Sequence, residues 1–600
     1  MAKNRCEFSE KDKWRVEDLY KNNEDCEKEL THLSKEIKKF KKYIGKILES
    51  SNTLLELLEL DTKVSQKLER AFIYAHINND ADTLDTYYQE LLGKAQNAYT
   101  NYLEETSYIV PELLESDYDQ VLEYIKENKD LNKYKRSLKH IYRNKKHILG
   151  KEAEKCLAAY AKVIDSADEI MGALTDSDFK FPNIIVEGKS VELTESNFSI
   201  YLRHADQKVR ERAFKTIYGV YKDFKTTLAA TMRQEIGKNV INAKLRNFKS
   251  SLEASLFSNE IDTLVYTNLI KSVHDNLEPL YKYFALKKNL LNIEDYHIYD
   301  TYADVSFKEK ETYEFERAKE LVLNAVLPLG EDYQRNIKKS FENGWIDICN
   351  NKGKRGGAYC TACYEVHPYV LLNYEKQLED VSTLAHELGH AIHYYYACEN
   401  QNFQDYSYSI FVAEVASQVN EILLCRYLLD NVSSNEEKMK IIDNLLQKYK
   451  STIYRQTMFA EFELFMHEYA EKGGVLTSET LCDKYLELNK LYYGNDVIVD
   501  EDIKYEWERI PHFYMNFYVY QYATGFMASV KIANEIYNGN EEMRDNYLEF
   551  LKLGCTKDPV SSLKVAGVDI TKIEVMADAI SFMNELLDKY KMYMGSEVNE

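Results

Sequence analysis

The hydrophobic positions along the chain recur mostly with the period of an α-helix. Helical spacing resumes over about 206–293 and again from 377 to the end, after a break at 175–194 where alternation around Glu187-Gly188-Lys189 predicts a β-hairpin. The pattern therefore predicts a mainly α protein with a domain boundary near 175–205. In the first part of the chain, six segments have helical periodicity: 23–48, 52–78, 84–106, 112–128, 131–147 and 150–173.

Two shorter regions depart from the helical pattern. Residues 294–307 have the looser composition of a connector, and 345–373 are rich in β-branched and aromatic residues around Gly356-Gly357. The second region predicts short strands within an otherwise helical part of the chain. Elsewhere, 21 glycines and 7 prolines in 600 residues are few interruptions, which favours long helices.

Composition narrows the classes of function. A formal net charge of −22 argues against nucleic acid as a partner. No apolar run of about 20 residues predicts a membrane span, and the segment from Met1 to Trp14 lacks the apolar core of a signal peptide. The 10 cysteines are scattered without a disulfide framework, and we interpret the lone CxxC of Cys360 and Cys363 as incidental thiols rather than a redox pair or half a zinc knuckle. These features predict a cytoplasmic protein.

The pentapeptide HELGH at 386–390 is the strongest chemical signal in the chain. His386 and His390, four residues apart on a helix, lie on one face and can bind one tetrahedral Zn²⁺. Glu387 lies beside the metal rather than on it, where it can take a proton from a metal-bound water. The competing interpretation is a pair of core histidines, but the apolar helical neighbourhood of the motif and its intact glutamate favour the metal.

A third protein ligand has two candidates, His393 and Glu414. His393 fails on distance, because seven residues of helix from His386 rise about 10 Å while zinc–nitrogen bonds are about 2.1 Å. Glu414 lies in the helical segment IFVAEVASQVNEILL and would complete a site of two histidines and one glutamate, leaving a fourth position for water. Glu421, two turns later, can hydrogen-bond a ligand histidine. The alternative for Glu414 is a solvated charge, although an unpaired carboxylate in an apolar run is costly.

HELGH followed by FVAEVAS resembles the thimet oligopeptidase group of zinc metallopeptidases, and within it oligoendopeptidase F. The resemblance covers nearly the whole chain, with Gly356 standing where the family pattern has a serine. The segments that carry it are WRVEDLY at 14–20, GKRGGAY at 353–359, HPYVLLNY at 367–374, DVSTLAHELGH at 380–390 and RIPHFYMNFYVYQYATGF at 509–526.

The resemblance implies an architecture and a cofactor. We expect an N-terminal helical domain at 1–200 and a zinc metallopeptidase catalytic domain at 201–600. The expected fold has two helical lobes around a deep substrate channel, with a small antiparallel sheet beside the zinc helix. One Zn²⁺ per chain and short unfolded peptides as substrates follow from the same resemblance.

The resemblance also extends the list of site residues. Small residues let a peptide approach an exposed strand edge and add to it, so Gly357, Ala358 and Tyr359 are expected to contact substrate; a simple bend is the alternative. His512, with Tyr514 or Tyr522, is expected to donate hydrogen bonds to the oxyanion, against the alternative of an aromatic core helix. The residues expected to support the metal ligands from behind are Glu421 and Asp380.

Together these features predict a zinc-dependent endopeptidase that hydrolyses internal bonds of short unfolded peptides by attack of a metal-bound water. Glu387 would accept the proton of the water and pass it to the leaving amine. A metallo-exopeptidase is one alternative and would need a charged pocket for the peptide terminus. A non-catalytic helical peptide-binding protein is another, against which the intact Glu387 argues. The pattern makes no prediction of oligomeric state.

Overall fold

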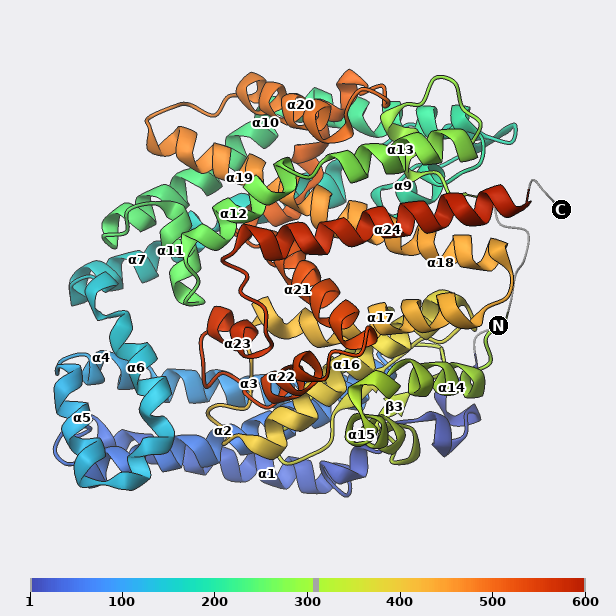
Figure 1. Cartoon of the computed structure of the whole chain (residues 1–600). Coiled ribbons are helices and arrows are strands. Elements are labelled where there is room, and N and C mark those ends of the chain that lie inside the picture. The colour runs from blue at the N-terminus through green and yellow to red at the C-terminus, as the bar shows by residue number, and fades with distance from the viewer. Residues whose placement is uncertain (1–2, 306–311, 598–600) are drawn as a thin grey trace. The chain divides into compact units, whose positions relative to one another are not determined.

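The computed structural model describes residues 3–305 and 312–597. Over these residues the structure is 72% helical and contains two small sheets, which confirms the predicted mainly α fold (Figure 1). No helix of the described residues is long and apolar enough to cross a membrane.

The chain forms two compact units, and each is built from three separate stretches. Unit 1 comprises Met1–Lys146, Glu311–Asp430 and Ile532–Val568, and unit 2 comprises His147–Lys310, Asn431–Lys531 and Asp569–Glu600. This spatial division differs from the sequence-based division into 1–200 and 201–600, because the N-terminal helices share a unit with the HELGH helix.

The N-terminal helices of unit 1 pack around α2 (Ser51–Ala81). Ser50 caps the start of α2 by accepting a hydrogen bond from the backbone N–H of Thr53 at 3.1 Å, and apolar residues at helical spacing, such as Leu54, Leu57 and Val64, are fully buried. The helices of this part are α1 (Asn23–Glu36), α2 (Ser51–Ala81), α3 (Thr86–Thr106), α4 (Ile109–Leu113), α5 (Tyr118–Glu127) and α6 (Lys135–Arg143).

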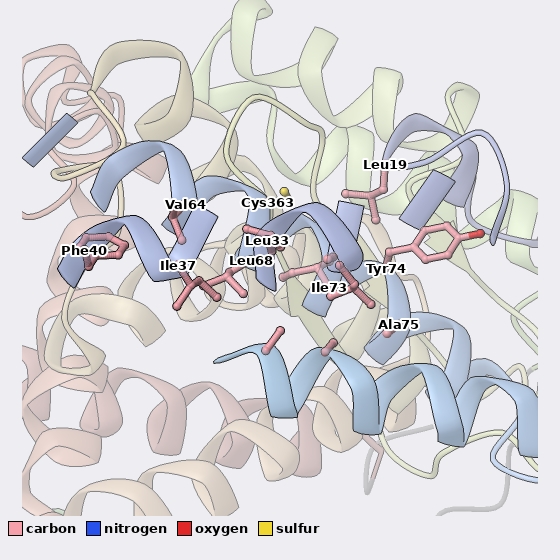
Figure 2. Close-up of a cluster of buried hydrophobic side chains, with 14 of the residues drawn as sticks. Leu19, Leu33, Ile37, Phe40, Val64, Leu68, Ile73, Tyr74, Ala75 and Cys363 are labelled. Carbon is pink, nitrogen blue, oxygen red and sulfur yellow. The ribbon is translucent and has the colours of Figure 1, made fainter. Parts of the chain in front are cut away.

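The hydrophobic core of these helices extends into the middle of the sequence. Cys363 lies among the buried side chains of α1 and α2 in Figure 2, and Tyr369 and Leu371 belong to the same cluster. Residues 345–373, predicted to form strands, are therefore anchored on the N-terminal helices.

Those strands form a three-stranded sheet of order β3-β5-β4, with bounds β3 (Ile346–Asp347), β4 (Tyr359–Thr361) and β5 (Tyr369–Leu371). β4 pairs antiparallel with β5, with Cys360 opposite Val370, whereas β3 pairs parallel with β5. The sheet is thus mixed rather than purely antiparallel as expected. It does lie beside the HELGH helix, α16 (Leu378–Asn400), which packs against both β4 and β5.

The other helices of unit 1 include α16 and the helices packed against it. α16 packs against α14, α15 and α22 as well as against the sheet. Their bounds are α14 (Phe315–Ala325), α15 (Glu331–Glu342), α16 (Leu378–Asn400), α17 (Ile410–Asn431), α22 (Glu541–Leu551) and α23 (Pro559–Val565).

Unit 2 is organised around the 39-residue helix α10. The predicted hairpin is present as β1 (Ile184–Val186) and β2 (Lys189–Val191), and the turn residues Glu187 and Gly188 both have positive φ, as a two-residue hairpin turn requires. The helices that begin in this unit are α7 (Lys151–Ile164), α8 (Ser166–Gly172), α9 (Glu195–Leu202), α10 (Gln207–Leu245), α11 (Ser251–Ser258), α12 (Thr263–His274), α13 (Glu278–Leu290), α18 (Asn435–Lys448), α19 (Arg455–Glu471), α20 (Ser478–Tyr493), α21 (Tyr520–Tyr537) and α24 (Ile573–Glu597).

Two less regular segments of unit 2 match the sequence pattern. The predicted connector at 294–307 holds the 3₁₀ turn Ile298–Tyr302, and its positions 306 and 307 lie outside the described residues. The RIPHFY segment forms the short 3₁₀ turn Pro511–Tyr514 between the 3₁₀ helix Glu501–Arg509 and α21.

Candidate metal centre and its surroundings

The helix that carries HELGH begins at a capping box. The carboxylate of Asp380 accepts hydrogen bonds from the backbone N–H groups of Glu375 at 2.9 Å and Gln377 at 2.8 Å. Asp380 was expected to support the metal ligands directly. Its bonds instead stabilise the first turn of α16, from which the ligands follow two turns later.

A glycine allows α16 and α17 to touch. A Cβ atom on Gly389 would lie 2.5 Å from the carbonyl oxygen of Ala416 and 2.5 Å from Cα of Ser417, both on α17. The two helices, adjacent in Figure 1, are also joined by the buried Asn420 side chain, which donates to the carbonyl of Ala385 at 3.1 Å. This contact brings the glutamates of α17 to the histidines of α16.

Three donor atoms converge between the two helices. Nε2 of His386 and Nε2 of His390 lie 3.2 Å apart, and Oε2 of Glu414 lies 3.4 Å from the first and 3.6 Å from the second. Ser417 orients the carboxylate by donating to the same Oε2 at 3.0 Å. Within residues 3–305 and 312–597, this is the one group of three or more metal-binding side chains that close around a common point.

These separations fit a tetrahedral metal ion. Donors about 2.0–2.1 Å from such an ion lie about 3.3–3.4 Å from one another. Two ring nitrogens and one carboxylate oxygen are also one of the donor sets that hold zinc in sites with an open fourth position. The residues present therefore fit the metal that the sequence pattern predicts.

Glu421 holds one of the histidines from behind. Its Oε1 lies 2.5 Å from Nδ1 of His386, and its Oε2 accepts from Ser382 at 3.4 Å. Burial lowers the pKa of His386, but the hydrogen bond and charge of Glu421 outweigh burial and leave this pKa raised. With Nδ1 donating to Glu421, Nε2 is left as a lone-pair donor toward the metal position.

Glu387 is buried beside this centre. The residue is 6% exposed, and its Oε2 has no hydrogen-bond partner among the described residues. Burial raises the pKa of Glu387 to about 7, opposed by the charge of His386 and assisted by that of Glu414. A buried carboxylate with a free oxygen and a pKa near neutrality suits a group that accepts and returns a proton.

His393, the rejected ligand, packs elsewhere. Its ring stacks on Tyr408, with centroids 3.7 Å apart and planes 4° from parallel, and it also contacts Phe550. Burial lowers the pKa of His393 to about 3, so this side chain is a neutral member of the core.

The GKRGGAY segment leads into the edge strand β4. Gly357 has φ +84, and apart from the glycine and its two chain neighbours no atom of the described chain lies within 4 Å of a Cβ placed at Gly356 or Gly357. Ala358 follows, and the hydroxyl of Tyr359 donates to Asp80 of α2 at 3.0 Å. The side chain of Tyr359 therefore anchors the strand, while the glycine backbone stays open on one side.

Of the two cysteines after Tyr359, Cys363 is buried and Cys360 is partly buried. Burial, followed by the negative charge of Glu387, raises the pKa of Cys360 well above its usual value. Burial, followed by the charge of Glu69, raises the pKa of Cys363 as well. No disulfide joins them. High pKa values keep both groups as thiols, which supports their interpretation as incidental cysteines.

Comparison with known proteins places this site in a family. The model of peptidase family M3 matches residues 200–582, and the model described as Oligopeptidase F matches residues 112–181. The chain belongs to peptidase family M3. The family implies a bound metal, and this M3 chain has the His-His-Glu cluster that would hold it.

Individual relatives extend the similarity over the whole M3 chain. Oligopeptidase PepF of Bacillus subtilis (strain 168) is 38% identical over 586 residues, covering 98% of this chain and 88% of its own length. The crystal structure of a peptidase from Chlamydophila abortus superposes with a TM-score of 0.92 at 34% identity, covering 99% of this chain and 100% of that one. Oligoendopeptidase-F from Enterococcus faecium superposes with a TM-score of 0.75 at 34% identity, covering 95% and 99%.

In unit 2 of the M3 chain, His512 lies among tyrosine rings. Its ring centroid is 6.3 Å from Tyr518 and 6.0 Å from Tyr522, and those two tyrosines are 5.4 Å apart. Tyr514 is not in this group, because its hydroxyl shares a hydrogen bond with Thr231 of α10 at 2.8 Å. The geometry thus groups His512 with Tyr522 and with Tyr518, which the sequence did not single out.

Three supporting residues of the metal centre were also missed. Ser417 orients Glu414, Asn420 joins the helices, and Gly389 lets them approach. Two of them gave a signal in the sequence. Helical spacing places Ser417 near Glu414, and a glycine such as Gly389 inside a helical pattern costs about 1 kcal/mol and needs a packing reason.

Proposed function

We propose that this M3 peptidase is a zinc-dependent endopeptidase that hydrolyses internal bonds of short unfolded peptides. One observation supports this proposal above all. The donor atoms of His386, His390 and Glu414 lie 3.2–3.6 Å from one another, and the buried Oε2 of Glu387 lies beside them. A purely structural metal site would need no adjacent carboxylate with an unpaired oxygen.

The chain's own residues then have distinct tasks. Glu421 fixes the ring of His386, and Ser417 fixes the carboxylate of Glu414. A zinc ion bound there would polarise the substrate carbonyl and lower the pKa of a water molecule. Glu387 would accept the proton of that water and deliver it to the leaving amine.

Substrate contacts complete the proposal. A peptide would add to the free edge of β4, beside Gly357 and Ala358, and be held mainly through its backbone. His512 and Tyr522 would donate hydrogen bonds to the oxyanion. The family resemblance implies a substrate channel, which would admit short unfolded peptides. A cytoplasmic location stays a prediction.

One experiment tests the metal and the reaction together. Zinc content is measured on the purified protein, and cleavage is measured on an internally quenched peptide blocked at both ends. We expect about one zinc per chain and cleavage despite the blocked ends, whereas an exopeptidase would require a free terminus. Zinc without turnover of any peptide would support a binding protein instead.

Paired variants test the ligand assignment. Glu414→Ala should lose zinc and activity, because it removes one of three donors. His393→Ala, a matched change on the same helix as the histidine ligands, should keep its zinc. Full occupancy in Glu414→Ala with lost occupancy in His393→Ala would overturn the assignment.

A further inference from the structure

A carboxylate at the end of α2 fastens the GKRGGAY segment. Asp80 is the second-last residue of α2, and its side chain is 3% exposed. Its Oδ2 accepts the hydroxyl of Tyr359 at 3.0 Å and lies 3.2 Å from Nη1 of Arg355. Nε2 of His76, one turn earlier on α2, lies 3.3 Å from the same oxygen. One buried side chain therefore contacts both ends of the stretch that contains the two glycines.

The backbone reinforces this attachment. The carbonyl of Asp80 accepts the N–H of Arg355 at 2.8 Å, and the carbonyl of Gly353 accepts the N–H of Thr83 at 2.7 Å. A Cβ on Gly353 would come within 2.5 Å of Oδ1 of Asp82, so this glycine permits the close approach. The end of α2 thus holds the segment at several successive points.

A second side chain holds the segment from the sheet. Nδ2 of Asn373, two residues after β5, donates to the carbonyl of Arg355 at 2.9 Å and to the carbonyl of Gly357 at 2.7 Å. The carbonyls of the glycine stretch are therefore fixed in direction before any peptide arrives.

The position of Asp80 is electrostatically unfavourable for stability alone. The C-terminal end of a helix carries partial negative charge, and a buried carboxylate there is doubly costly. The guanidinium of Arg355 and the donors around Asp80 offset this cost. A carboxylate at this position of α2 does not serve the stability of the helix. Its presence therefore indicates that the GKRGGAY segment, which Asp80 holds, needs it.

We propose that Asp80 is a positioning residue for substrate binding, which together with Asn373 presents the glycine stretch and β4 as a preformed edge for the peptide backbone. This inference rests on the proposed function, because it specifies how the edge strand of that site is held. Glycines lose more conformational freedom on ordering than other residues. Fixing the glycines in advance removes this entropic cost from peptide binding. The loss of Asp80 should therefore weaken the affinity for the peptide rather than slow the chemical step.

The test compares two carboxylates on the same helix. Asp80→Asn removes the charge of the positioning residue, and Tyr359→Phe removes only one hydroxyl that it accepts. Asp61→Asn is the matched control, because Asp61 on α2 accepts the hydroxyl of Tyr102 at 2.6 Å, remote from the sheet. Each variant is measured for zinc content, Tm, kcat and KM on the blocked quenched peptide.

We expect Asp80→Asn and Tyr359→Phe to raise KM about tenfold with kcat changed less than about threefold, as loss of a charge-assisted buried hydrogen bond predicts. Zinc content should match the parent, and Asp61→Asn should leave KM within about twofold. A second readout uses a peptide N-methylated at the residue that pairs with β4. The parent should bind it more weakly than the plain peptide, and Asp80→Asn should discriminate less between the two.

Affinity for the uncleaved peptide, measured in a Glu387→Gln background, separates binding from turnover. Equal effects of Asp80→Asn and Asp61→Asn on KM, or unchanged discrimination against the N-methylated peptide, would overturn the positioning role. A parent protein that binds no zinc or cleaves no blocked peptide would instead overturn the proposed function. Should Asp80→Asn fail to fold, Tyr359→Phe carries the same expectation with a near-isosteric change.

Discussion

The helix pair α16–α17 and the segment around His512 hold their polar side chains in different ways. In the helix pair, regular backbone places His386 and His390 one turn apart, and one close contact at Gly389 brings Glu414 to them. Around His512, short 3₁₀ turns replace the regular helix, and side chains of other elements hold the backbone. The first arrangement depends on a single interface, whereas the second depends on many scattered contacts.

The turn after His512 shows this dependence. Asn516 has φ 47 and Phe517 has φ 61, two successive non-glycine residues in a left-handed conformation that costs energy. The buried carboxylate of Glu463 on α19 accepts the N–H of Phe517 at 2.6 Å, and Ser255 donates to the carbonyl of Asn516 at 2.7 Å. These anchors stabilise a conformation that the local sequence disfavours.

The largest expected effect is in the helix pair. Glu387→Gln keeps size and polarity but removes the proton acceptor, so kcat should fall about 10²–10⁴-fold. Zinc content and Tm should stay at the parent values, because no ligand is lost. Near-normal turnover by a metal-loaded variant would reject Glu387 as the base.

The next largest effect is expected in the segment around His512. His512→Ala should lower kcat about 10²–10³-fold with little change in KM or zinc content, as loss of an oxyanion donor predicts. Tyr522→Phe should lower kcat more than Tyr514→Phe, because Tyr522 lies beside His512 while Tyr514 bonds to Thr231. A His512→Ala protein with unchanged kcat, or one that unfolds, would favour an aromatic core without a catalytic role.

A smaller change tests the single interface. Gly389→Ala forces a methyl against the backbone of α17, so we expect a loss of about 1–3 kcal/mol in the free energy of unfolding and weaker zinc binding. Gly93→Ala on α3, where no described atom outside the adjoining helix backbone and chain neighbours lies within 4 Å of the new Cβ, should instead stabilise by about 0.5–1 kcal/mol. Denaturant unfolding measures the free energy of unfolding, and zinc titration measures the zinc affinity. Equal values of both quantities in the two variants would show that the close contact at Gly389 contributes to neither.

The smallest expected effect is a pH dependence of stability that arises from Glu463, the side chain that accepts the N–H of Phe517. Burial raises the pKa of Glu463 to about 8 from its usual 4.5. The folded state therefore binds more protons than the unfolded state between these values, so the contribution of Glu463 to stability falls as pH rises through that window. Glu463→Gln carries no titrating proton and can still accept the N–H of Phe517.

The Tm of Glu463→Gln minus that of the parent should thus increase from pH 5 to pH 8 and level off above. Glu468→Gln, an exposed glutamate on the same helix, controls for the loss of a negative charge. A difference that stays constant with pH would mean that Glu463 is ionised throughout.

The two regions also differ in how far the sequence predicted them. The helical period alone places His386 and His390 on one face, and an apolar surrounding marks Glu414 and Glu421, so the donor cluster was predicted as the structure shows it. Tyr514 was grouped with His512 although its hydroxyl bonds to Thr231, because 3₁₀ turns have no period that reveals which ring faces which.

Sequence patterns did not predict the contacts between parts of the chain that are far apart in sequence. β3 has only two residues, too few for an alternating pattern, so its parallel pairing with β5 was not foreseen. Asp80 and Arg355 are 275 positions apart. The only local signal for Asp80 was an acidic residue near a helix C-terminus, which occurs at many exposed positions.

The three-part make-up of unit 1 has a consequence for the timing of its synthesis. α22 packs against α16, where Phe550 contacts the ring of His393 and the carbonyl of Lys552 accepts the side chain of Gln401 at 2.6 Å. On the ribosome, all of the metal-binding side chains are therefore synthesised more than a hundred residues before α22. Because domains generally fold as units, peptidase activity is expected to arise only when the chain is nearly finished.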